Sequence, residues 1–133
     1  MNQSPSIEQK NLYCLQICSL AYIEDVAQNL LSILPEKFRK NTNDLRIYVE
    51  NFATPETLKG LSLENKYDLL GVYHKREELL SNVISLYRAP IIRYTQEFEE
   101  SIEEVVHQVM IHEMAHHFSI PPFQLKKIID ARL

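Results

Sequence analysis

The sequence of 133 residues has only two glycines, two cysteines and no tryptophan, and it has no apolar run long enough to span a bilayer. The apolar stretch of residues 12–23 is interrupted by Gln16 and Ser19. It also lacks the basic segment that begins a signal peptide. These absences predict a cytoplasmic protein without a membrane partner.

The two cysteines, Cys14 and Cys18, are four residues apart in a stretch with a helical pattern. Side chains at this spacing point along the same helix face, which is a poor geometry for a disulfide between them. We interpret both as small buried apolar residues. A metal site at the pair is the alternative, although no neighbouring residue completes one.

The chain also lacks a concentration of positive charge. Its 14 basic and 18 acidic residues give a net charge of −4, and the only tight basic cluster is Lys37, Arg39 and Lys40. A nucleic-acid partner is therefore not expected. There are no repeats, low-complexity tracts or linkers, and the length suits one domain over residues 1–133, with residues 1–20 as a helical extension.

Hydrophobic periodicity predicts an α+β fold. Apolar residues recur at helical spacing over residues 7–34, with a break near Ser19 to Tyr22 that makes a helix pair. Alternation predicts strands at residues 45–50, 69–74 and 83–88. Shorter helical pieces are expected at residues 36–40, 54–60, 90–94 and 122–132, and residues 75–82 are expected to form a loop or helical turn. The prediction is a small mixed sheet of about three strands packed on the helices.

The most informative pattern is His112-Glu113-Met114-Ala115-His116, which has the form HExxH. It follows an apolar helical run from Ile102 with Ser101 as a plausible N-cap. On a helix, His112 and His116 lie on nearly the same face and can bind one Zn²⁺, while Glu113 is placed to take a proton from a bound water. The competing interpretation is a solvated helix C-terminus, where the helix dipole favours cationic side chains such as protonated histidine.

A zinc peptidase needs a third protein ligand, which in the form HExxHxxGxxH/D follows a glycine turn. Here Ser119 stands at the glycine position and Pro122, which has no ligating side chain, stands at the ligand position. Ser119 is expected to cost about 1 kcal/mol if it adopts the left-handed conformation. Asp130, the only acidic residue after the motif, is a weaker candidate for the missing ligand.

Five other residues near these elements can carry chemistry. His117 is rotated about 100° from His116, so we expect it to hydrogen bond to the sheet or a loop rather than to a metal. His107 is expected at the surface, and His74 ends the second strand without a predicted partner. Tyr73 and Tyr87 can donate hydrogen bonds, but aromatic strand residues usually serve in packing.

The motif and several upstream segments resemble the minimal zincins, small bacterial metallopeptidase-like proteins that end in HExxHHFGxxD. The matching segments are Leu34-Pro35-Glu36-Lys37-Phe38-Arg39, Asp68-Leu69-Leu70-Gly71-Val72-Tyr73, Ile84-Ser85-Leu86-Tyr87-Arg88 with Pro90-Ile91, and His112 to Phe118. The resemblance spans about residues 20–130. It implies zinc at His112 and His116, a catalytic Glu113, and an edge strand at residues 69–74 that borders a peptide cleft.

Two functional hypotheses follow. The first is a zinc-dependent metallopeptidase with a degraded metal site, acting on a peptide or protein substrate. The alternative is a catalytically inactive zincin-fold protein that binds a peptide or protein. A zinc-dependent oligomer, in which another chain supplies the missing ligand, is a third possibility, and the sequence leaves the oligomeric state open.

Overall fold

The computed structural model describes residues 18–132 and is an α+β fold, as the periodicity predicts. Strand β1 (Leu45–Glu50) pairs in parallel with β3 (Ser81–Tyr87), and β3 pairs antiparallel with β2 (Gly71–Arg76). The sheet order is β1-β3-β2, so β2 is an edge strand. The expected edge strand is thereby confirmed, with its start two residues later than predicted.

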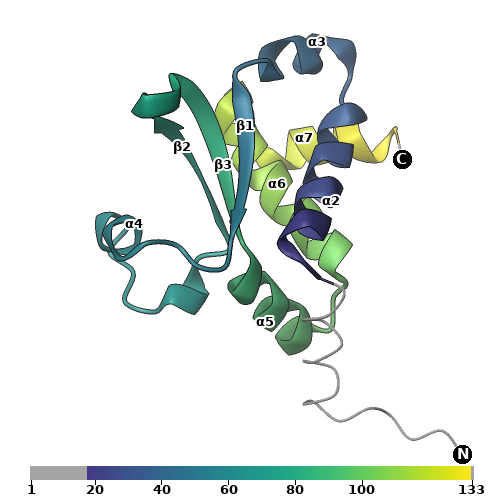
Figure 1. Ribbon diagram of the computed structural model, residues 1–133. Coiled ribbons are helices and arrows are strands. Elements are labelled where there is room, and N and C mark those ends of the chain that lie inside the picture. Colours follow the sequence, from purple (N-terminus) through teal and green to yellow (C-terminus); the bar gives the residue numbers. More distant parts are fainter. Residues whose placement is uncertain (1–17, 133) are drawn as a thin grey trace, which may run out of the picture.

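Helices α2 (Leu20–Ser32), α6 (Ile102–Phe118) and α7 (Pro122–Asp130) lie on one face of the sheet (Figure 1). Helix α2 packs on β1 and on α6, and α7 packs on α6. The core between them consists of alternate strand residues and apolar helix residues, among them Ile47, Ile84, Leu86, Leu30, Val106 and Met110. Burial of these side chains is the main source of stability for such a layered fold.

Capping residues set the helix boundaries. The Ser19 side chain accepts a hydrogen bond from the Tyr22 N–H at 3.0 Å, which starts α2 at the predicted break. Ser101 does the same for Glu104 at 3.1 Å at the start of α6. The first helix of the predicted pair, including Cys14, lies outside the described residues. Cys18 is 2% exposed, so its prediction as a buried residue is confirmed.

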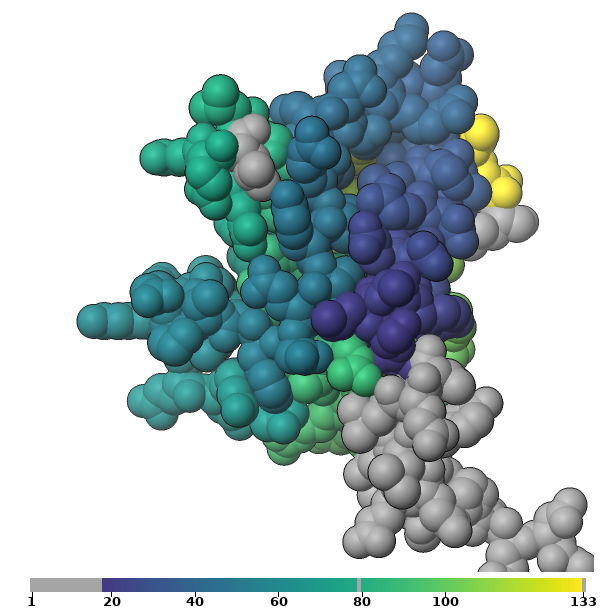
Figure 2. Space-filling view, in the orientation of Figure 1, coloured from purple at the N-terminus to yellow at the C-terminus, as the bar shows by residue number. Residues whose placement is uncertain are grey.

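The remaining elements are short connections, apart from α5 (Arg88–Phe98), which runs four residues past the predicted end. Figure 2 shows the α4 region as a projection beside the sheet. None of the helices found in residues 18–132 is long and apolar enough to cross a membrane. The short elements are α3 (Glu36–Arg39), η1 (Lys40–Thr42), α4 (Pro55–Gly60), η2 (Lys66–Asp68) and η3 (Glu77–Leu79).

Gly71 allows β2 to lie close to α6. A Cβ atom built on Gly71 would be 2.6 Å from Val109 Cγ1 and 3.0 Å from the Ser85 carbonyl oxygen. Contacts this short exclude any side chain unless the strand or the helix moves. The absence of a side chain at Gly71 therefore lets the Val109 side chain of α6 lie against β2.

Candidate active site

The HExxH residues lie in the second half of α6 with unequal exposure. His112 and His116 are exposed, whereas Glu113 is buried. The two imidazole ring centres are 5.2 Å apart. Two imidazoles on one tetrahedral zinc have ring centres about 5 Å apart, because each Zn–N bond is about 2.0–2.1 Å. The pair therefore has the spacing of two ligands of one metal ion.

Glu113 is held between the edge strand and His116. Its Oε2 accepts a hydrogen bond from the Tyr73 backbone N–H at 3.0 Å and lies 3.4 Å from His116 Nδ1. Burial raises the pKa of Glu113, and the opposing effects of His116, the Tyr73 N–H and His112 do not cancel that rise. A carboxyl group with a raised pKa is better matched to general base chemistry near neutral pH.

No side-chain pattern indicated the contact of Tyr73 with Glu113, because the donor is a backbone group. The Tyr87 N–H donates to the Leu70 carbonyl at 2.9 Å, so Leu70 pairs with β3. Alternation along an antiparallel ladder then directs the backbone groups of Gly71, Tyr73 and Lys75 to the free edge. The hydrogen bond to Glu113 is made at this edge.

A cavity of about 370 Å³ lies beside His112 and Glu113. Most of its wall is apolar and comes from the start of β2, from α5 and from α6. Gln108 and the exposed Asp68 add polar groups. The apolar lining residues are Leu69, Leu70, Gly71, Tyr94, Val105 and Val109.

The C-terminal turn of α6 keeps a glycine-type geometry without glycine. Ser119 has φ 56° and ψ 42°, in the left-handed region. Its N–H donates to the His116 carbonyl, and the Ile120 N–H donates to the Ala115 carbonyl at 3.1 Å. This pair of bonds is a Schellman motif. Ser119 therefore adopts the left-handed conformation whose cost was considered from the sequence.

Beyond the turn, Pro122 is the first residue of α7 and offers no ligand. Asp130 instead accepts a hydrogen bond from Lys126 Nζ at 3.0 Å on the exposed part of α7. Within residues 18–132, no group of three histidine, cysteine, aspartate or glutamate side chains is placed to hold a metal ion. The described residues therefore supply two of the three protein ligands that a catalytic zinc site needs, and they do not supply the third.

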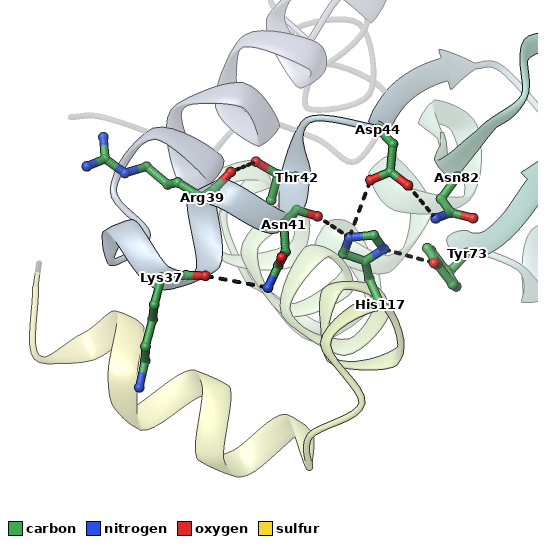
Figure 3. A network of polar contacts seen from close by, with 8 residues as sticks. All are labelled: Lys37, Arg39, Asn41, Thr42, Asp44, Tyr73, Asn82 and His117. Atoms are coloured by element: carbon green, nitrogen blue, oxygen red, sulfur yellow. Dashed lines mark hydrogen bonds and ion pairs between the residues drawn. The ribbon is translucent and has the colours of Figure 1, made fainter.

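His117 lies in a separate, closed network (Figure 3). Its Nε2 is 2.5 Å from the Asn41 carbonyl, and its Nδ1 is 2.9 Å from the Tyr73 hydroxyl. Because a carbonyl only accepts, Nε2 is the donor in the contact with Asn41. Burial and the Asp44 charge raise the pKa of Tyr73, which keeps its hydroxyl a donor. The predicted structural role of His117 is confirmed.

The other candidate residues lie away from the motif pair. His74 Nε2 is 3.0 Å from Ser85 Oγ, a contact on the sheet face opposite Tyr73. Tyr87, on the same face as Ser85, is buried as a packing residue. His107 is half-buried rather than fully at the surface.

Comparison with known proteins identifies the family of the chain. A search of curated proteins found no significant match. The model of the zincin-like metallopeptidase family matches residues 42–131, a segment that contains all three strands and the HExxH helix. That match spans more than half of the chain, so this protein belongs to the zincin-like metallopeptidase family.

Proposed function

We propose that this protein binds an extended peptide in the cleft between β2 and α6, and that its capacity for hydrolysis is weakened by the missing third ligand. The observation that carries the proposal is the apolar cavity beside His112 and Glu113. At about 370 Å³, this cavity is within the range of small-ligand sites, and it suits a large apolar side chain better than a charged one.

The free edge of β2 supports a peptide as the ligand. The outward Tyr73 N–H is already bonded to Glu113, so an added strand would pair through the other outward backbone groups, and its alternate side chains would enter pockets on one face. Gly71 lines both the edge and the cavity. A peptide paired with the start of β2 would therefore have one side chain next to the cavity and its backbone next to Glu113.

The retention of Glu113 favours peptide hydrolysis as a second candidate function. Its carboxylate is fixed by Tyr73 and next to two metal-type ligands, an arrangement that a pure binding protein does not need. In zincins, a bound zinc supplies an activated water and polarises the carbonyl. With two protein ligands in the described part of the chain, zinc would be held loosely, and we expect weak turnover.

The test of binding is a panel of fluorescent peptides with different apolar side chains, titrated in chelator so that metal plays no part. Val109→Phe fills the cavity and should weaken binding at least tenfold, which is about 1.4 kcal/mol. Val72→Phe makes the same change on the opposite face of β2 and serves as the matched control. Equal affinity of the two variants would contradict the proposed cleft, as would failure of every peptide to bind.

The test of hydrolysis uses Glu113→Gln, which keeps the side-chain shape but removes the base. Cleavage by the wild type that this substitution abolishes would establish the enzyme. Cleavage that survives it would indicate a contaminating peptidase.

A further inference from the structure

We propose that one zinc ion joins two copies of this chain through His112 and His116 of each copy. The two rings are exposed and have the ring-centre separation of 5.2 Å described above. The side chain of His116 is 55% exposed, and Glu113 faces its Nδ1. The Nε2 atom is therefore the nitrogen of His116 that remains open to an ion approaching from outside.

The coordination that one copy offers is half of a tetrahedral set. Structural zinc sites have four protein ligands, and two histidines fill two of those positions. The position at which a further ligand would follow the Ser119 turn is occupied by Pro122, and Asp130 is paired with Lys126. No third ligating side chain joins the pair anywhere in residues 18–132. The histidine pair is retained but the third ligand is absent, so a second copy of the chain is the source we propose for the remaining ligands.

A two-fold axis through the ion satisfies this requirement without any further residue. The axis makes the two histidine pairs equivalent, and the interface is isologous, as in most homodimers. Each chain carries a net charge of −4, so two metal-free copies repel each other at low ionic strength. Dimerisation is therefore expected only when the cation is present.

The bridged form has a consequence for the cleft. Four imidazole nitrogens leave no position for water on the ion, and the second copy covers the region of His112, which lines the peptide cavity. Zinc-bridged dimers are therefore inactive in hydrolysis and exclude peptide. This consequence rests on the proposed peptide-binding function, whereas the bridge itself rests only on the histidine pair.

The experiment is native mass spectrometry and sedimentation velocity of the full 133-residue chain, purified without an affinity metal and titrated with zinc chloride or chelator. The expected species are a monomer in chelator and a dimer with one zinc per two chains when zinc is added. His112→Ala and His116→Ala should each weaken zinc-dependent dimerisation at least tenfold. His107→Ala, on the same helix, should not change it. Cobalt in place of zinc should give the strong visible absorption of a tetrahedral site.

Two results would overturn the bridge. A monomer with one zinc per chain would show that a single copy completes the site, and a dimer that persists in chelator or in His112→Ala would show another interface. Failure of the protein to bind zinc at all would also overturn it. Peptide affinity measured in chelator is independent of these results, so a failed bridge and a failed peptide cleft are distinguishable.

Discussion

His116 and His117 are neighbours in sequence, but their surroundings differ in kind. The side chain of His117 is 8% exposed, and both ring nitrogens have partners from other elements, Asn41 and Tyr73. His116 is exposed, its Nδ1 faces Glu113 and its ring lies against that of His112, both on the same helix. We call the His117 side of the helix end closed, because that ring is buried and has partners from other elements, and the His112–His116 side open, because both rings are exposed. One short segment therefore contains both a structural histidine and a pair of potential metal ligands. The structural histidine is the buried one, and the potential ligands are exposed.

The largest effect that distinguishes the two sides is on stability. His117→Ala removes a buried ring and leaves the Asn41 carbonyl and the Tyr73 hydroxyl without their partner. We expect the free energy of unfolding to fall by about 2–3 kcal/mol. His116→Ala should change it by less than about 0.5 kcal/mol, because the side chain is exposed. Urea unfolding of both variants in chelator measures the difference, and equal losses would contradict the contrast.

Gly71→Ala tests whether the close packing of β2 on α6 depends on the missing side chain at residue 71. The new Cβ would lie 2.6 Å from Val109 Cγ1, so β2 must move away from α6 at a cost of about 1–3 kcal/mol. Gly60→Ala is the matched control, because nothing lies within 4 Å of its Cβ position. If Val109 is the obstacle, adding Val109→Ala should restore part of the lost stability. A cost at Gly71 that is independent of Val109 would place the strain elsewhere.

Restoring the missing ligand should make the open side a better metal site. Pro122→Asp together with Ser119→Gly is expected to raise zinc affinity at least tenfold, which is about 1.4 kcal/mol. The reason is that residue 119 keeps the left-handed turn at which HExxHxxGxxH/D proteins have glycine. An aspartate three residues later would then stand at the position of the third ligand in that pattern. Isothermal titration calorimetry compares the double variant with the wild type. Ser119→Gly alone should stabilise the fold by about 0.5–1 kcal/mol without changing zinc affinity.

The smallest effect concerns the pH dependence of stability in the metal-free protein. Burial raises the pKa of Glu113 above 4.5, so the folded chain keeps this proton to a higher pH than the unfolded chain does. The free energy of unfolding of the wild type should therefore fall, relative to Glu113→Gln, as pH rises from about 4.5 through the raised pKa. Thermal unfolding in chelator at several pH values measures the difference in stability between the wild type and Glu113→Gln. A difference that stays constant with pH would show that Glu113 titrates normally.

Much of the fold was predictable because the patterns are local. Alternation in residues 45–50 predicted β1, and Ser101 with the following apolar stripe predicted the start of α6. The sequence interpretation ended β2 too early because Lys75 and Arg76 are charged. In the structure, Arg76 extends the strand, with its guanidinium 3.1 Å from Glu50 and over the ring of Tyr48.

The site was predictable only in part, because its decisive contacts are made between distant segments. The HExxH spacing indicated the histidine pair, and rotation about the helix axis indicated the different role of His117. The hydrogen bond from Tyr73 to Glu113 joins residues 40 positions apart and depends on a backbone group. No side-chain pattern encodes such a contact. It follows from Gly71, which brings the strand against Val109.

We expect His112 and His116 to act as an open metal-binding pair, with His117 on the closed side. The most direct measurement is elemental analysis of zinc in three variants, His112→Ala, His116→Ala and His117→Asn, beside the wild type, all purified without chelator or affinity metal. We expect the first two variants to lose their zinc and the third, if it folds, to retain it. Equal zinc in the wild type and in His112→Ala, or loss of zinc in folded His117→Asn alone, would contradict this expectation.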